Sequence, residues 1–412
     1  MRNPRSILFA GLALAAPIAL ADEPPAWCEA ERSMLVGHQQ LTSADRFARA
    51  GEAYFSPDGR WIVFQAVAPA ATGGPATNDY SIYLARLTTA DEKAGVVCTG
   101  FGVPAQAKPL AITEITLLTP PEAASTCAWF NPREPWMVIF GSTMSPPAEQ
   151  APAGFQRGTS TYAWKFPRET EIMQFPLGRV HRELKKNNPA IPEFTPPRRG
   201  SGPTPVFTRD GYDAECSYSP DGRHLLYTHA DPETRDADIW VFDTVALRHT
   251  PLVERPGYDG GAFFSPDGKA ICYRSDVKGN DLLQVFVATL DFDDAGATKG
   301  VKAEFQVTDN DAVNWAPFWH PSGEFLVYTT SEQGHDNYEI YSVEAPVGAS
   351  AGKVPALLRR KRITHAPGFD GLPALSADGT LMMWTSQRGG AAPGEERASS
   401  QLWIARVADL RP

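Results

Sequence analysis

The sequence is poor in basic side chains, and beyond its N-terminus it has no long apolar run. It carries 38 basic and 48 acidic side chains, for a net charge of −10. Nucleic-acid binding requires a basic surface. The one basic run, Arg359-Arg360-Lys361-Arg362, is interpreted as a strand edge that discourages pairing between sheets. We therefore expect no nucleic-acid partner.

Motifs of common catalytic sites are also missing. The chain contains neither the Gly-x-Ser-x-Gly of α/β-hydrolases, nor His-Glu-x-x-His, nor a glycine-rich phosphate loop. The repeats described below leave no room for a separate hydrolase domain. The sequence thus assigns no catalytic residue.

The five cysteines, an odd number, cannot all be paired within one chain. Cys127, Cys216 and Cys272 lie in apolar, strand-like segments, where a small buried side chain is expected. A bridge between Cys98 and Cys127 is one pairing to be tested. The cysteine spacings, Cys28 included, match no zinc-ligand pattern.

Residues 1–21 have the pattern of a cleavable secretory signal. Arg2 and Arg5 precede an apolar run over residues 7–20, which ends in the small-x-small site Ala19-Leu20-Ala21. An uncleaved membrane anchor is the alternative. Residues 22–35 would form an N-terminal extension, and no later segment is apolar enough to span a membrane. We expect a periplasmic or secreted monomer.

The tetrapeptide Ser-Pro-Asp-Gly occurs at residues 56–59, 219–222 and 265–268, with altered copies at 320–323 and 376–379. Apolar or aromatic runs flank the copies, which predicts strand, tight turn, strand. Proline fixes φ at the first turn position, aspartate accepts a hydrogen bond from the backbone two residues on, and glycine takes the positive φ that closes the turn. Turn chemistry alone therefore explains the motif.

Alignment of the copies predicts an all-β fold, a single six-bladed β-propeller of four-stranded antiparallel blades over residues 36–412. Blade two is the degenerate copy, with strands at 127–130, 136–140 and 171–175 and Pro-rich loops at 145–152 and 189–205. The pattern gives only five outer strands for the six blades, at 116–119, 205–208, 250–253, 305–308 and 362–364. We predict that residues 38–42, which end in Gln-Leu-Thr, supply the sixth, completing the last blade and closing the ring.

The repeats resemble those of the TolB-like β-propeller family, which carry this turn and a third strand containing Ile-Tyr or Ile-Trp. Here those pairs are Ile82-Tyr83, Ile239-Trp240 and Ile340-Tyr341. The resemblance covers nearly everything after the signal and implies a partner-binding scaffold with a funnel-like channel. The extra N-terminal domain of TolB is not expected here, so the resemblance does not extend to the translocation role.

Topology divides the loops between two ends of the ring. The Ser-Pro-Asp-Gly turns lie at one end, called the turn face; the loops that enter the inner strands or join strands two and three lie at the other, the loop face. The candidate binding residues on the loop face are Glu215, Asn314, Trp315, His335 and His365, with Asp213, Asp259 and Asp370. The same face also holds Glu52, Asp276, Lys278, Asn280 and Asp336. Alternatively, the repeated Asp and Asn residues cap turns and bond adjacent blades.

Two functional hypotheses follow. The first is an exported, non-catalytic propeller that binds a protein or cell-envelope component through its loop face, without a cofactor. A structural Ca²⁺ near the axis is compatible with it. The second is a metal-dependent polysaccharide lyase or hydrolase using the same face, for which His335 and His365 would be a small set of ligands.

Overall fold

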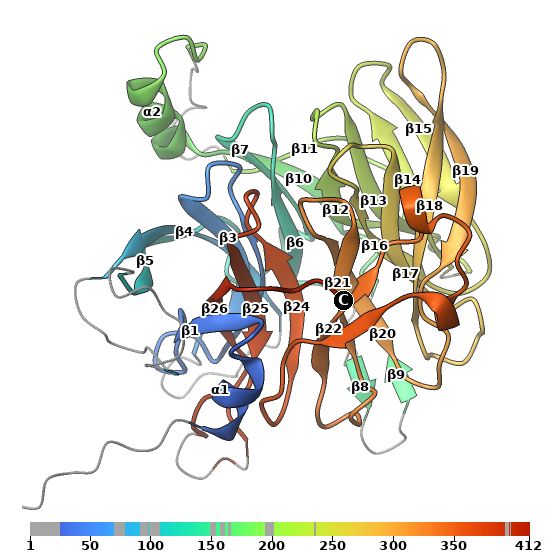
Figure 1. Ribbon diagram of the computed structural model, residues 1–412. Coiled ribbons are helices and arrows are strands. Elements are labelled where there is room, and N and C mark those ends of the chain that lie inside the picture. The colour runs from blue at the N-terminus through green and yellow to red at the C-terminus, as the bar shows by residue number, and fades with distance from the viewer. Residues whose placement is uncertain are drawn as a thin grey trace, which may run out of the picture.

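The chain folds into six four-stranded antiparallel sheets arranged as a six-bladed β-propeller, which confirms the predicted fold (Figure 1). The computed structural model describes residues 25–69, 79–90, 98, 108–148, 154–156, 161–163, 166–193, 202–234, 236–391, 395 and 397–412. The predicted signal, residues 1–21, and parts of both Pro-rich loops lie outside the described residues.

The blades follow one another along the chain, each running from its inner to its outer strand. Blade one holds β2 (Arg49–Phe55), β3 (Trp61–Val67), β4 (Ser81–Thr89) and β5 (Leu110–Leu117). Blade two holds β6 (Ser125–Phe130), β7 (Met137–Ser142), β10 (Glu171–Pro176) and β11 (Thr204–Pro205). Blade three holds β12 (Tyr212–Tyr218), β13 (His224–Ala230), β14 (Ala237–Asp243) and β15 (Arg248–Val253).

The second half of the ring repeats this order. Blade four holds β16 (Asp259–Phe264), β17 (Ala270–Ser275), β18 (Gln284–Phe292) and β19 (Thr298–Gln306). Blade five holds β20 (Asn314–Trp319), β21 (Phe325–Thr330), β22 (Glu339–Glu344) and β23 (Arg360–Arg362). Blade six holds β24 (Asp370–Leu375), β25 (Leu381–Ser386), β26 (Gln401–Val407) and β1 (Leu35–Gln40).

Short helices, 3₁₀ turns and one hairpin lie outside the six blades. The helix α2 (Gly178–Asn187) follows β10 and lies beyond the turn face, at the top of Figure 1. The helix α1 (Ala26–Glu31) and the hairpin of β8 (Gly154–Gln156) and β9 (Thr161–Ala163) lie at the opposite end. Two 3₁₀ turns, η1 (Gly348–Ser350) and η2 (Pro355–Leu357), precede β23. No described helix is long and apolar enough to cross a membrane.

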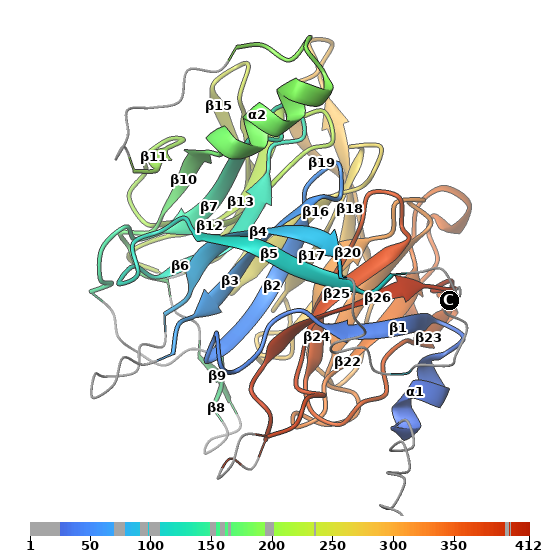
Figure 2. The same ribbon diagram turned by 90° about the vertical axis from the view of Figure 1, so that its left-hand side faces the viewer.

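The ring is closed by its N-terminal strand, as predicted. Each inner strand packs beside the inner strands of two neighbouring blades, from β2 through β6, β12, β16 and β20 to β24 and back to β2. The strand β1 pairs antiparallel with β26, from Leu35 opposite Val407 to Gln40 opposite Trp403 (Figure 2). The strand β1 begins three residues before the predicted segment 38–42 and ends two residues before the end of that segment.

Four of the five threonines that ended predicted outer strands have a common role just beyond the strands. Each hydroxyl accepts a hydrogen bond from a backbone N–H of the third strand, at 2.8–3.1 Å, in place of a backbone carbonyl. The four pairs are Thr42 with Leu402, Thr119 with Ile82, Thr308 with Val285 and Thr364 with Ile340. Because this bond replaces the ladder, β5 ends at Leu117 rather than at the predicted residue 119.

The Ser-Pro-Asp-Gly turns have the expected geometry. In blade three, Asp221 accepts a hydrogen bond from the Arg223 N–H at 3.1 Å, and Gly222 has φ +67°. The Ser219 hydroxyl donates to Asp221 at 2.6 Å and accepts from the His224 N–H at 2.9 Å. The serine thus joins the turn to the returning strand, a contribution that the sequence pattern alone did not assign.

The cysteine pairing differs from the bridge considered above. Cys98 is bonded to Cys28, with a Cα–Cα distance of 5.4 Å, whereas Cys127 is free. The Cys98–Cys127 bridge cannot form because Cys127 lies on the inner strand β6, while Cys98 lies in the long connection outside β4. The free Cys216 and Cys272 are buried as predicted, but Cys127 is only half-buried.

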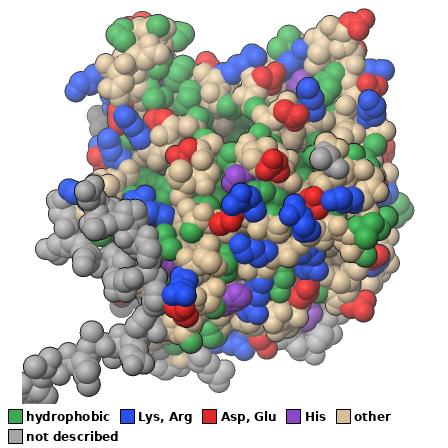
Figure 3. Space-filling model, viewed as in Figure 1, with side chains coloured by type: hydrophobic (Ala, Val, Ile, Leu, Met, Phe, Trp, Pro, Cys, Tyr) green, Lys and Arg blue, Asp and Glu red, His purple; other side chains and the backbone are tan. Residues whose placement is uncertain are grey.

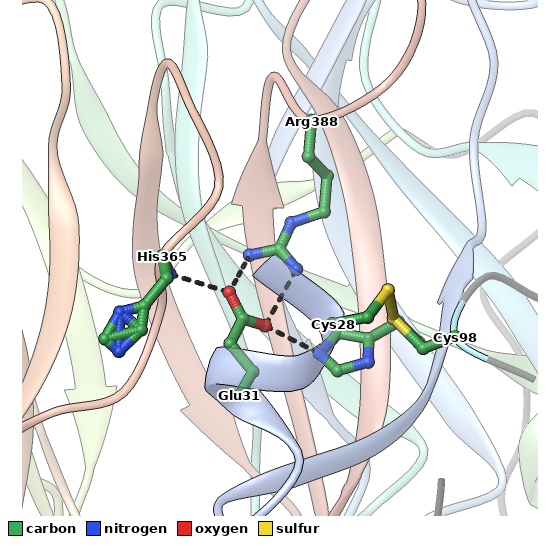
Figure 4. The surroundings of a disulfide bond; sticks show 6 residues. Cys28, Glu31, Cys98, His365 and Arg388 are labelled. Atoms are coloured by element: carbon green, nitrogen blue, oxygen red, sulfur yellow. Dashed lines mark hydrogen bonds and ion pairs between the residues drawn. A yellow bond between two sulfur atoms is a disulfide. The ribbon is translucent and has the colours of Figure 1, made fainter. Parts of the chain in front are cut away.

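A buried ionic cluster fastens α1 to the last blade (Figure 4). The Arg388 guanidinium donates to Glu31 at 3.0 Å and to Asp370 at 2.8 Å. Glu31 also contacts His38 Nε2 at 2.7 Å and accepts a hydrogen bond from the His365 backbone N–H at 2.7 Å. The side chains of Glu31, His38 and Arg388 are fully buried. A charged cluster therefore anchors the segment that leads into β1.

These charges shift the protonation of the cluster. Burial alone would raise the pKa of Glu31, but the Arg388 charge and the His38 hydrogen bond outweigh it and lower this pKa to about 2. Burial lowers the pKa of His38, although Glu31 opposes the effect. The cluster accordingly contains an ionised Glu31 and a neutral His38.

The basic run lies on the outer edge of blade five, where Lys and Arg side chains are gathered in Figure 3. Three of its members face carboxylates: Arg359 with Glu344, Arg360 with Glu332 and Arg362 with Glu339. The run is thus an edge strand whose charges are largely balanced.

Candidate functional site

Every inner strand carries the same irregularity near its middle. The pairing register shifts once between the first and second strands of each blade, which marks a β-bulge. One residue of each bulge has positive φ, between +41° and +59°. These six residues, called the floor ring, are Glu52, Cys127, Glu215, Gly261, Ala316 and Leu372. All six line one small space, of about 20 Å³, at the centre of the propeller.

Aromatic side chains close the channel on the side of the turn face. They stand two residues after the floor ring on four of the six inner strands, and are called the aromatic plug: Tyr54, Trp129, Phe263 and Phe318. Successive ring centroids lie 4.9, 5.3 and 5.3 Å apart, within the range of packed aromatic pairs. The space at the floor ring has room for about one water. The channel is therefore a blind funnel rather than a through-pore.

The funnel opens on the loop face as a cavity of about 490 Å³. Its aromatic lining consists of Tyr80, Trp315, Tyr338 and Phe369. Its polar lining includes Gln65, Thr126, His335, Asp336, Thr385, Gln387 and Ser400, with Glu52, Cys127, Glu215 and Arg274 at the bottom. A cavity of this size that combines aromatic walls with convergent polar groups is typical of ligand-binding sites.

One carboxylate at the bottom of the cavity is fully engaged. Glu215 accepts hydrogen bonds from the Tyr258 hydroxyl at 2.7 Å and the Thr228 hydroxyl at 3.0 Å. Arg274 lies 3.2 Å from the same carboxylate. Burial would lower the pKa of Arg274, but Tyr258 and Glu215 outweigh it and raise this pKa. Gly261 makes this pair possible, because a Cβ there would meet Arg274 Nη1 at 2.2 Å.

The second carboxylate is held differently. Glu52 accepts a hydrogen bond from the Tyr54 hydroxyl at 3.1 Å, and its backbone N–H donates to Thr385 Oγ1 at 3.0 Å. Among the described residues, none with a basic side chain forms an ion pair with Glu52. Burial raises the pKa of Glu52, despite the neighbouring Cys127 thiol and the Arg274 charge.

The Cys127 thiol shares this site but is not activated. Burial raises its pKa well above the ordinary value, and the charges of Glu52 and Glu215 add to the effect. A cysteine nucleophile requires the opposite shift. Cys127 is thus a neutral, weakly polar member of the floor ring.

The structure brings three of the eight predicted site residues together. Glu215, Trp315 and His335 line the cavity, with Glu52 and Asp336 of the wider set. The ring nitrogen Nδ1 of His335 lies 3.2 Å from the Tyr338 hydroxyl, which holds the imidazole at the cavity wall.

Four further predicted residues stand two positions before the floor ring, outside the cavity lining. All four are buried, and each bonds to a polar side chain. The pairs are Asp213 with His229 at 2.8 Å, Asp259 with Arg255 at 3.0 Å, Asn314 with Gln284 at 3.1 Å and Asp370 with Arg388 at 2.8 Å. The alternative expected such residues to cap turns or bond adjacent blades, and among these four only the bond of Asn314 with Gln284 joins two blades.

The last predicted residue, His365, lies beside α1, where its backbone contacts Glu31. It is not part of the cavity lining that contains His335. In the part of the chain that the structure describes, no group of three or more His, Cys, Asp or Glu side chains is arranged to hold a metal ion.

Sequence reasoning missed Arg274 and the aromatic wall of Tyr80, Tyr338 and Phe369. The pair Gly260-Gly261, in an inner strand, was the available signal for Arg274, because two residues without Cβ leave room for a neighbour's long side chain.

No family model and no curated protein sequence matches this chain. Solved structures with a similar fold include putative TolB from Agrobacterium tumefaciens, at 14% identity and a TM-score of 0.48, covering 90% of this chain and 98% of that one. TolB from Acinetobacter baumannii follows at 12% and 0.47, covering 86% and 65%. An oligogalacturonate lyase from Vibrio parahaemolyticus matches at 10% and 0.43, covering 90% and 93%. At these identities the likeness concerns the propeller fold and not an activity.

Proposed function

We propose that the chain is a non-catalytic binding propeller, whose loop-face cavity receives a protruding segment of a protein or cell-envelope partner. The observation that carries this proposal is the blind, aromatic-walled funnel of about 490 Å³, which suits a side chain or a chain end rather than a flat surface. Binding would occur at the axis, where six blades contribute to one site.

Two observations support a binding role over a catalytic one. The thiol at the floor ring is held protonated by burial and neighbouring carboxylates. The described cavity lining contains a single histidine, His335, bonded to a tyrosine hydroxyl. Neither arrangement supplies an activated nucleophile.

The Cys28–Cys98 disulfide supports export to the periplasm or outside the cell, because such bonds persist in oxidising compartments. Together with the signal pattern over residues 1–21, it favours an exported protein.

Site-specific photo-crosslinking tests the proposal. A photoreactive residue replaces exposed Asp336 at the cavity rim or, as a matched control, exposed Asp267 in a turn of the opposite face. In envelope extracts, we expect a discrete adduct from position 336 and none of the same mass from position 267. The purified partner should then bind the Trp315→Ala variant at least tenfold more weakly. Equal adducts from both positions, or turnover of an acidic glycan by the purified protein, would overturn the proposal.

A further inference from the structure

The bottom of the cavity contains two acidic side chains but only one basic side chain. Two carboxylates, Glu52 and Glu215, and one guanidinium, Arg274, face the same space. We propose that the missing positive charge comes from the ligand, as a primary ammonium group that contacts Glu52. This inference rests on the proposed binding function and specifies the chemical class of the inserted segment.

Glu215 is not available for this role. Its carboxylate already receives hydrogen bonds from two hydroxyls and faces Arg274 at 3.2 Å. Arg274 is committed as well, since it donates to the Tyr258 hydroxyl at 2.6 Å and its Nη1 lies over Gly261. These four groups form a closed set that needs no ligand.

Glu52 has unused capacity. An ionised carboxylate offers about four acceptor positions, and the Tyr54 hydroxyl and the Cys127 thiol occupy two of them. The side chain lines both the floor space and the open cavity, so a group entering from the loop face can reach it. Burial raises the pKa of Glu52 and so favours the protonated carboxyl, whereas a neighbouring ammonium group would lower this pKa and favour the ionised form.

The cavity walls favour an ammonium group borne on an apolar body. Trp315 and Phe369 have ring centroids 6.2 Å apart, and Phe369 and Tyr338 have centroids 5.6 Å apart, so three aromatic rings form one continuous wall. Aromatic faces attract cations and also cover methylene groups. A strongly hydrated metal ion would gain little binding free energy from contact with such a wall. A peptide N-terminus and a lysine side chain both present the required chemistry.

Three synthetic peptides separate these sources. Ala-Ala-Ala-amide has only an α-ammonium, N-acetyl-Ala-Ala-Lys-amide has only a lysine ammonium, and N-acetyl-Ala-Ala-Ala-amide has neither. Affinities are measured at pH 7.5 by ligand-observed NMR with the full mature chain. We expect at least one charged peptide to bind tenfold or more tightly than the neutral one, and the better of the two identifies the source.

Matched variants locate the effect. Glu52→Gln keeps the shape but removes the charge, and should abolish the preference for a charged peptide. Glu233→Gln removes an exposed charge that is not part of the cavity lining, and should leave the preference unchanged. Thr126→Lys adds an ammonium on the wall of the open cavity, and should block the charged peptides even if Glu52→Gln folds poorly.

Equal affinity for the charged and neutral peptides would overturn the inference, as would a preference that survives in Glu52→Gln. Binding of Ca²⁺ at the same site in competition with the peptides would replace the ammonium by a metal ion. A crosslinked partner from position 336 that binds Glu52→Gln as tightly as the wild type would refute this inference while leaving the binding function intact. Failure of both crosslinking and peptide binding would refute both.

Discussion

Replacing Glu31 by glutamine should destabilise the folded ring, because Glu31 anchors the segment that leads into the closing strand β1. The carboxylate sits at the centre of the buried cluster, in contact with Arg388, His38 and the His365 backbone. Removing one partner of a buried ion pair costs about 3 to 5 kcal/mol, because the other charge is left poorly compensated. Arg388 retains Asp370 at 2.8 Å, so we expect a loss near the lower end, about 3 kcal/mol. That is a large part of the 5 to 15 kcal/mol typical of a folded domain.

The same helix supplies a matched control. Glu29 pairs with Arg32 at 3.0 Å, but both side chains are 55% exposed. Glu29→Gln should therefore cost less than about 1 kcal/mol. The free energy of unfolding is measured by urea titration of both variants and the wild type under oxidising conditions. If Glu31→Gln and Glu29→Gln unfold at the same urea concentration, the buried cluster does not stabilise the ring as argued.

Three further predictions concern pH and the floor ring. The pKa of His38 is lowered from 6.5 in the fold, and that of Glu31 from 4.5 to about 2, so these two groups bind fewer protons in the folded chain than in the unfolded one. The stabilisation that they contribute should be lost as pH drops below about 6.5 and again below about 4.5, and the difference in melting temperature between the wild type and Glu31→Gln should shrink accordingly. Gly261→Ala should lower the free energy of unfolding, measured in urea, more than Gly323→Ala does. Alanine is strained by the positive φ at both positions, but only at position 261 does its Cβ clash with Arg274; equal losses would contradict this. At Leu372, with φ +55°, valine should cost at least about 1 kcal/mol more than methionine, because branching at Cβ disfavours the left-handed region; equal melting of the two variants would argue against strain there.

Much of the fold could be read from the sequence because turn chemistry is local. The Ser-Pro-Asp-Gly copies need only their own residues to form the turn, and their spacing sets the number of blades. In four blades a threonine just beyond the outer strand caps the third strand of the same blade, as Thr308 does for Val285. The pairing of Cys28 with Cys98 was beyond such reasoning, since it depends on how distant segments meet.

The site was harder to predict because the β-bulge breaks the alternation of a strand. Thr126 and Cys127 are consecutive, yet both line the cavity, which a regular strand does not allow. The rule of alternate residues therefore could not place the floor ring. The position of repeated acidic residues such as Asp213 at the start of the inner strands predicted a binding role, but these residues bond to neighbouring side chains outside the cavity.

The uneven composition of the floor ring has a consequence for how a partner must approach. The backbone repeats six times around the axis, but the two carboxylates of the floor ring belong to blades one and three, while Ala316 and Leu372 on blades five and six are apolar; the neighbouring Arg274 belongs to blade four. A ligand that meets this ring has one preferred rotation about the axis. The rest of the partner would then have one fixed orientation over the loops at the rim. Each blade would always face the same part of the partner, so its loops could evolve a contact with that part alone.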